Sequence, residues 1–445
     1  MPRSDPPQSA PADAATPRLE AAYRKVGWRL IPFLMACYLF AYLDRVNVGF
    51  AKLQMNADLG LSDTVYGLGA GLFFLGYFLF EVPSNLMLHR TGARLWIARI
   101  MVSWGLVSMA MSLVESAASF YALRFLLGVA EAGFFPGIIL YLTYWYPARR
   151  RGRITALFMS SVAISGVVGG PLSGWILASM GGVRGWAGWQ WLFFLEGLPA
   201  MLMGLAVLFY LPERIEAAGW LEAEERRLLR ARIDAEDQTK RSIPVMAVLR
   251  SGRTWHLSGI YFCLVAGLYG VAFWLPTLIR DTGIVDPLRI GFLNALPYAL
   301  AVAGMLLVAR SADARQERRW HVAGPAALGA LGLLLTTAWS HDSVTAMAAL
   351  SLATLGILSA LPQFWSLPTA YLTGAGAAAG IGLINSLGNL AGFASPYLVG
   401  WLKDTTQGFG TGILVLAALL LLGAWLTLRI PTNLVAGGPP SASAS

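Results

Sequence analysis

Long apolar segments separated by short polar stretches dominate the chain. The twelve segments run near residues 28–50, 66–88, 95–114, 119–145, 154–178, 189–211, 255–279, 290–309, 321–339, 344–368, 374–402 and 410–428. Most of them reach the roughly 20 residues that a helix needs to cross a bilayer. Their apolar residues are continuous rather than alternating, which excludes a membrane β-barrel. The pattern therefore predicts an all-α integral membrane protein with twelve transmembrane helices.

The longest interruption, residues 212–253, divides these helices into two sets of six. Within it, Leu221, Leu228, Leu229 and Ile233 recur near helical spacing, which predicts an amphipathic helix on the cytoplasmic surface. We expect six-helix halves at 21–211 and 254–430, and disordered cytoplasmic tails at 1–20 and 431–445. Two such halves joined by a long linker describe the major facilitator fold, in which the substrate site lies between the halves near the midplane.

The composition agrees with a membrane protein, because 56% of the residues are hydrophobic and only 13% are charged. A soluble chain carries about 25% charged residues. The net charge of +9 could suggest a nucleic-acid partner, but 26 of the 33 Lys and Arg residues fall in segments on the side of the N-terminus. Only 5 fall on the opposite side. This positive-inside bias predicts that both termini are cytoplasmic, and it accounts for the basic charge without nucleic acid.

Two charged residues, Asp44 and Arg45, lie inside the first apolar segment. A charged side chain at membrane depth is costly unless it is paired or faces a wet cavity, so it indicates function. Neighbours on a helix point about 100° apart, so at least one of the two needs a partner elsewhere. The alternative is that both side chains snorkel to the membrane interface.

The fourth segment carries Arg124 and Glu131, seven residues and about 10 Å apart on one helix face. By helical rise, Arg124 and Asp44 lie at similar depth, which predicts an ion pair between them. Glu131 lies deeper and has no cation spaced to neutralise it on its own helix. Burial favours the neutral form of a carboxyl, so Glu131 is the best candidate proton carrier. Arg45 would then face the cavity, where its planar fork suits a carboxylate. A purely structural pairing of Arg124 is the alternative.

The second half has no charged residue in its apolar segments but carries neutral polar groups. Asn385 and Asn389 are four residues apart on one helix face, and Ser366 lies in another helix. Charge in one half with amide and hydroxyl groups in the other suits an anion with hydroxyl or ring substituents. Helix–helix hydrogen bonding is the competing interpretation for these amides. Glu81 and Glu196 also lie within helices, and we interpret both as structural.

Four motifs together resemble the anion:cation symporter family of the major facilitator superfamily. They are YLDRVNVGFA at 42–51, EVPSN at 81–85, RFLLGVAEAGFFPG at 124–137 and NSLGNLAG at 385–392. The resemblance covers roughly residues 20 to 430 and is nearest to bacterial permeases for tartrate and related sugar acids or aromatic acids. It implies that Asp44 and Glu131 couple protons. It also implies that Arg45, Tyr77, Asn389 and Ser366 hold the substrate.

The resulting hypothesis is a secondary transporter that imports a small organic anion by proton symport in the inner membrane of a bacterium. We expect it to act as a monomer with no cofactor and no metal, since no metal-ligand spacing appears. The alternative is a proton-driven exporter, because GPLSG at 170–174 resembles part of a signature of facilitator antiporters. A membrane enzyme has no catalytic constellation to support it.

Overall fold

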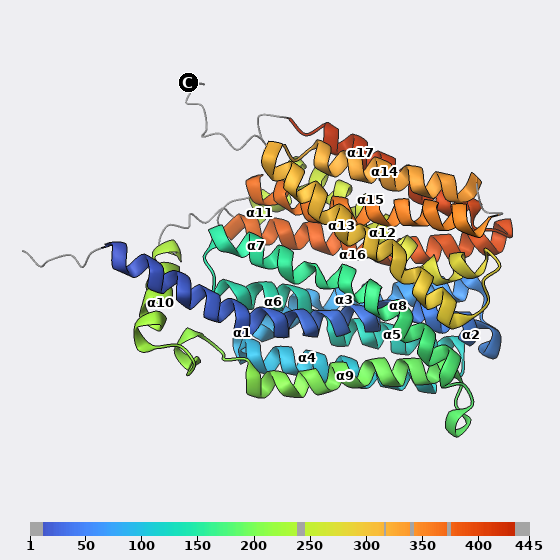
Figure 1. Cartoon of the computed structure of the whole chain (residues 1–445), viewed down its shortest axis with the longest axis horizontal. Coiled ribbons are helices and arrows are strands. Elements are labelled where there is room, and N and C mark those ends of the chain that lie inside the picture. The colour runs from blue at the N-terminus through green and yellow to red at the C-terminus, as the bar shows by residue number, and fades with distance from the viewer. Residues whose placement is uncertain (1–11, 238–244, 316, 339–341, 372–374, 432–445) are drawn as a thin grey trace, which may run out of the picture.

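The computed structural model describes residues 12–431, apart from 238–244, 316, 339–341 and 372–374, and in this part every regular element is a helix. The first bundle comprises α1 (Ala12–Val46), α2 (Val48–Leu59), α3 (Asp63–Thr91), α4 (Ala93–Ala110), α5 (Ala117–Glu131), α6 (Phe134–Thr143), α7 (Ala148–Met159), α8 (Ser161–Ser179) and α9 (Gly188–Tyr210). The second comprises α12 (Gly252–Arg280), α13 (Pro287–Arg315), α14 (Trp320–Ala338), α15 (Ser343–Tyr371), α16 (Ala375–Thr406) and α17 (Gly410–Leu428). Figure 1 shows the two bundles as the lower and upper parts of the molecule, with their helices running lengthwise.

Eleven of the described segments are long and apolar enough to cross a membrane. The remaining helix, α16, lies at the expected eleventh segment and runs the length of the second bundle. The sequence-based prediction of an all-α, twelve-helix membrane protein is therefore confirmed. Four of the predicted segments are longer or broken in the structure, because α2 continues α1, α6 continues α5, α8 continues α7, and a short 3₁₀ turn follows α4.

In the sequence, α10 (Ala223–Asp237) and α11 (Val245–Leu249) lie between the two bundles; in space α10 packs against α1, and α11 against α16. The buried face of α10 includes Leu229, and the Nζ of Lys25 in α1 lies 2.6 Å from the Oε1 of Glu225. We call the end of the molecule that carries α10 the terminal end, and the opposite end, where α2 lies, the distal end (Figure 1). The expected disordered segment 1–20 is wrong for residues 12–20, where Ala-rich sequence already forms α1. Residues 1–11 and 432–445 lie outside the described part.

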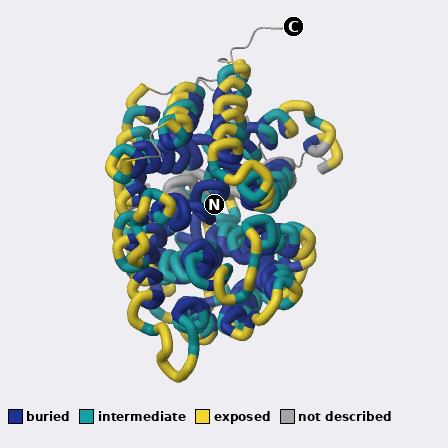
Figure 2. Tube along the Cα trace, turned by 90° about the vertical axis from the view of Figure 1, so that its right-hand side faces the viewer, coloured by how far each residue is buried: buried dark blue, intermediate teal, exposed yellow. Residues whose placement is uncertain are grey.

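The periphery of the bundle carries large exposed apolar side chains. Figure 2 looks along the helices and shows exposed residues around the outside with buried residues within. Phe209 is 90% exposed, and Leu307 and Val344 are similarly uncovered. Apolar side chains facing outward over the length of the helices are what a lipid environment requires, because lipid tails are as apolar as the side chains.

The two halves meet closely in the distal part of the molecule. There α3 packs against α16, and α8 packs against α13. A Cβ added at Gly170 of α8 would lie 2.5 Å from the carbonyl oxygen of Gly291 in α13, so the backbones approach as only glycine permits.

A network of charged residues closes the distal end. The Nζ of Lys52 lies 2.7 Å from Asp63 Oδ1, and the Nζ of Lys403 lies 3.1 Å from Asp63 Oδ2. Lys403 also approaches Asp281 at 3.6 Å, and Asp404 accepts hydrogen bonds from the backbone and hydroxyl of Thr64. Lys52, Asp63 and Thr64 belong to the first half and the other three residues to the second, so the network ties the halves together.

Candidate functional site

A break between α5 and α6 places Glu131 in the site. Helix α5 ends at Glu131, Ala132 leaves the helical conformation with ψ 132°, and Gly133 takes the left-handed conformation with φ +84° before α6 begins. A Cβ at Gly133 would lie 2.4 Å from the Oγ of Ser84, so both conformation and space favour glycine. Such a discontinuous helix is typical of transporter substrate sites. Arg45 lies near the end of α1, and Asn47, which joins α1 to α2, keeps helical φ and ψ, so this part of the chain runs on without a kink.

Arg45 lies between the halves and joins them. Its Nη2 forms an ion pair with Oε1 of Glu131, and its Nη1 donates to the hydroxyl of Tyr269 in α12 at 2.8 Å. Both charged side chains are buried, Arg45 with 6% and Glu131 with 0% of its surface exposed. The Nε of Arg45 and the Oε2 of Glu131 are buried without a hydrogen-bond partner among the described residues. Each partner therefore retains polar capacity that a ligand, water or proton can use.

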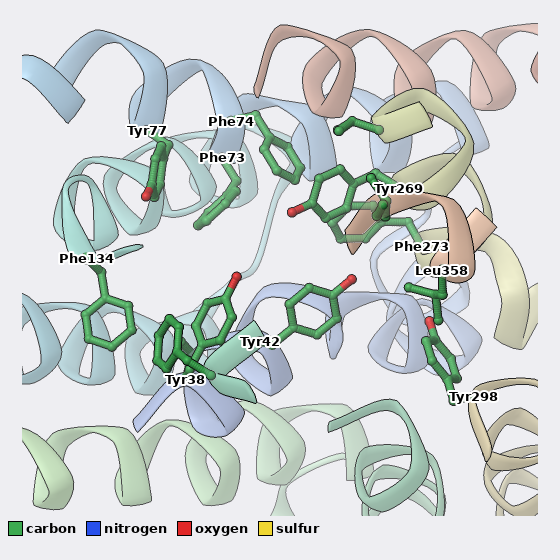
Figure 3. Close-up of a cluster of buried hydrophobic side chains, with 14 of the residues drawn as sticks. Tyr38, Tyr42, Phe73, Phe74, Tyr77, Phe134, Tyr269, Phe273, Tyr298 and Leu358 are labelled. Carbon is green, nitrogen blue, oxygen red and sulfur yellow. The ribbon is translucent and has the colours of Figure 1, made fainter. Parts of the chain in front are cut away.

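Aromatic rings surround this guanidinium. Its Cζ lies 5.3 Å from the ring centre of Phe73, 5.7 Å from Tyr77 and 5.9 Å from Tyr42. Figure 3 shows the aromatic cluster, with Tyr38 and Tyr42 of α1 opposite Phe73, Phe74 and Tyr77 of α3. A buried cation within about 6 Å of several ring faces gains cation–π stabilisation that partly replaces its hydration.

Asp44 points away from Arg45 into the first half, as the helical geometry requires. Its Oδ2 accepts a hydrogen bond from the Nε1 of Trp104 at 2.7 Å, and its Oδ1 accepts one from the Oγ of Ser108 at 2.9 Å. Only 1% of its surface is exposed. Both donors are neutral and lie four residues apart on α4, so this carboxyl is held without a counter-charge among the described residues.

The predicted Asp44–Arg124 ion pair is wrong. Arg124 is fully buried, but it donates to the carbonyl oxygens of Gly69 and Ala70 in α3 at 3.3 and 3.2 Å. Its Cζ also lies 5.2 Å from the ring centre of Phe73, the same ring that Arg45 approaches. Arg124 faces α3 whereas Asp44 faces α4, so equal depth does not bring them together.

The second half contributes amide groups through an unexpected contact. Asn385 and Asn389 of α16 donate from their Nδ2 atoms to the two oxygens of Glu81 in α3, at 2.9 and 3.2 Å. Glu81 thus bonds across the halves, a contact that its interpretation as a structural residue did not specify. Ser366 of α15 donates to the carbonyl oxygen of Gln363 in its own helix.

Glu196 of α9 occupies a separate position in the first half. Its Oε1 accepts a hydrogen bond from Ser173 of α8 at 2.7 Å, and its Oε2 has no partner among the described residues. It is 2% exposed. Within the part of the chain that the structure describes, no three His, Cys, Asp or Glu side chains gather as a metal site would require.

The structure therefore brings two predicted residues, Glu131 and Tyr77, to the guanidinium of a third, Arg45. Sequence reasoning missed the acceptor of Arg45 on the second half, Tyr269, and the two donors to Asp44. Trp104 and Ser108 gave a readable signal, because they are polar groups at i and i+4 on an otherwise apolar segment.

The chain matches the family model of the Major Facilitator Superfamily over residues 34–396. The chain belongs to this superfamily. A protein of Agrobacterium vitis named for tartrate transport is 51% identical over 91% of this chain and 93% of its own length. A quinolone resistance transporter of Acinetobacter baumannii is 46% identical over 92% of this chain and 95% of its own length. These matches confirm the resemblance drawn from the four motifs.

A solved structure shares the fold. The Escherichia coli xylose transporter XylE, in a partially occluded inward-open conformation, superposes with a TM-score of 0.72, covering 91% of this chain and 99% of that one, at 13% identity. This major facilitator protein is thus a multi-pass membrane transporter and not an enzyme.

Proposed function

We propose that this transporter imports a small organic anion together with protons, by alternating access. The substrate class is a tartrate-like dicarboxylate, a sugar acid or an aromatic acid, as the 51% identity to the protein named for tartrate transport supports. The observation that carries the proposal is the buried guanidinium of Arg45, held between the Glu131 carboxylate and the Tyr269 hydroxyl at the junction of the halves.

Arg45 couples the proton to the anion, because the carboxylate of Glu131 and the carboxylate of the substrate compete for its guanidinium. When Glu131 is ionised, the guanidinium is paired and neutralised. When Glu131 takes up a proton, Arg45 becomes available as a bidentate donor to the carboxylate of the substrate. Anion binding and protonation of Glu131 therefore favour each other, which is the linkage that a symporter requires.

The remaining site residues take supporting roles. Tyr77 and Phe73 form the wall around Arg45, while Asn389 and Ser366 of the second half contact the far end of the substrate. Asp44 is a second carboxyl available to protons. Arg124 contributes positive charge near Glu131 that opposes its protonation.

Alternating access follows from the division into halves. The state described has the distal end closed by Lys52, Asp63 and Lys403. Rocking of the halves about the bound anion would break this network and open the distal mouth while the terminal end closes. We assign the terminal end to the cytoplasm of a bacterium, with the protein in the inner membrane, because most Lys and Arg residues lie at that end. We propose that the monomer is the functional unit, because Arg45 and Glu131 of the first half already meet Tyr269 of the second half within this chain.

The test is a calorimetric binding screen of tartrate, galactonate, 4-hydroxyphenylacetate and phthalate on the purified protein. Uptake of the binding acid into proteoliposomes under an inward proton gradient would follow. We expect one acid to bind and to accumulate only while the gradient lasts. Absence of binding by every acid, or accumulation that ignores the gradient, would contradict the proposal.

A proton-driven exporter is the second candidate. It is favoured by the 46% identity to a quinolone resistance transporter and by the GPLSG motif at 170–174. In the structure Gly170 and Gly174 of this motif pack against α13, which is the contact that any rocking of the halves must shift. Proton-dependent efflux of a quinolone from the same liposomes, without uptake of any acid, would decide for the exporter.

A further inference from the structure

Glu81 holds the amide groups that the second half offers to the site. Each of its oxygens accepts one amide hydrogen bond, from Asn385 at 2.9 Å and from Asn389 at 3.2 Å. The two asparagines are one turn apart on α16, so they present their amides as a matched pair to a single carboxylate. Glu81 is 5% exposed, and no ion pair to it occurs among the described residues.

This contact adjoins the guanidinium site. Tyr77 lies one turn before Glu81 on α3, and its ring centre is 5.7 Å from the Cζ of Arg45. A substrate that places one carboxylate on Arg45 and extends along α3 therefore reaches the Glu81–Asn389 contact next.

We propose that Glu81 is an internal competitor of the substrate: its carboxylate occupies the Asn385 and Asn389 amides in the empty site, and the incoming anion displaces it. The inference rests on the proposed function. The competition arises because the N–H of each amide that donates to the carboxylate of Glu81 cannot donate equally to a second acceptor. A charged acceptor that already lies across the halves must be released before a substrate can take its place.

Because Glu81 competes with the substrate, removing its carboxylate should tighten anion binding rather than weaken it. Removing the carboxylate in Glu81→Ala leaves two amide donors unpaired in the empty site, and a ligand then gains their hydrogen bonds without displacing anything. We expect the dissociation constant for the anion to fall about tenfold, which corresponds to ~1.4 kcal/mol. We also expect the KM for uptake to fall with it. A residue that merely braces α3 against α16 would give weaker or unchanged binding.

The test uses the full-length protein and whichever of tartrate, galactonate, 4-hydroxyphenylacetate and phthalate binds the parent. Calorimetry compares the parent, Glu81→Ala, Asn389→Ala and the double variant. Asn389→Ala should weaken binding, and the gain in affinity from Glu81→Ala should shrink strongly in the Asn389→Ala background, because the contested donor is gone.

Glu81→Gln preserves side-chain volume and one acceptor, so it should give a smaller gain in affinity and serves if the Ala variant does not fold. Glu115→Ala, which removes an exposed carboxyl in the loop before α5, is the control and should change nothing.

Binding by Glu81→Ala and Glu81→Gln that is no tighter than that of the parent would overturn the inference and leave the proposed function standing. An equal gain with and without Asn389 would overturn it as well. A parent that binds none of the four acids would instead remove the proposed function, and this inference with it.

Discussion

Arg45 of α1 and Glu131 of α5 form a buried ion pair where the two halves meet, while Asp44, the adjacent residue, turns into the first half toward Trp104. Consecutive residues thus serve two environments. One faces the junction of the halves and the other a sealed pocket of neutral donors. This separation keeps the Arg45 guanidinium, which we propose binds the anionic substrate, apart from Asp44, the second carboxyl available to protons.

The first prediction concerns the shape of the Arg45 side chain. In Arg45→Lys we expect anion affinity to fall at least about tenfold, since an ammonium cannot hold Glu131, Tyr269 and a carboxylate with the planar fork of Arg. Calorimetry on purified protein measures the change, and Arg289→Lys in the exposed first turn of α13 is the matched control. Near-parental affinity in Arg45→Lys would mean that Arg45 only holds the halves together.

The second prediction concerns the partners of Asp44. Asp44→Asn presents an amide to Trp104 and Ser108, both donors, and should lower the free energy of unfolding by about 1–3 kcal/mol. Because Ser108 is a direct partner, the melting shifts of Asp44→Asn and Ser108→Ala should combine non-additively.

Arg124 provides the control for this cycle. It bonds the carbonyl oxygens of α3 rather than Asp44, so Asp44→Asn and Arg124→Gln should shift the melting temperature additively. If the melting shifts of Asp44→Asn and Arg124→Gln were strongly coupled while those of Asp44→Asn and Ser108→Ala were additive, the Asp44–Arg124 ion pair would be supported against the structure.

The third prediction concerns the distal network. Lys403→Ala removes the cation that links Asp63 of the first half to Asp281 of the second, so the distal-closed state should lose population. A cysteine introduced at Ala272, which is buried in α12, reports the opening in a background where Cys37 and Cys263 are replaced by serine.

We expect a membrane-impermeant maleimide to label this cysteine faster in Lys403→Ala than in the parent. Arg289→Ala is the control, because Arg289 is exposed in the first turn of α13 and pairs with the neighbouring Asp286. Equal labelling rates in all three proteins would show that the network does not hold the distal end closed.

The sequence predicts the position of a residue along its helix axis, but not the direction in which its side chain faces a neighbouring helix. Depth along a helix axis follows from residue number, which is why the buried placement of Asp44, Arg45 and Glu131 was predicted correctly. Rotation of one helix about its axis relative to its neighbours does not follow from residue number. The assumed Asp44–Arg124 pair failed for that reason, and the pairing of Glu131 with Arg45 on another helix was not foreseen.

Contacts between the halves were beyond sequence reasoning. Glu81 and Asn389 are 308 residues apart and meet only because α3 packs against α16. The i,i+4 spacing of the two asparagines indicated a shared face but not the carboxylate that would occupy it. The kink at Gly133 was likewise hidden among many glycines, most of which serve helix packing.

The central claim is that Glu131 carries the coupled proton through its pair with Arg45. Glu131→Gln imitates the protonated carboxyl permanently and leaves the guanidinium available to the substrate. In reconstituted liposomes, this variant should bind the anion and exchange internal for external anion in a counterflow assay as the parent does. It should fail to concentrate the anion under an imposed pH gradient, because it has no proton to release. Gradient-driven accumulation equal to that of the parent would contradict the account and transfer the coupling role to Asp44 or Glu196.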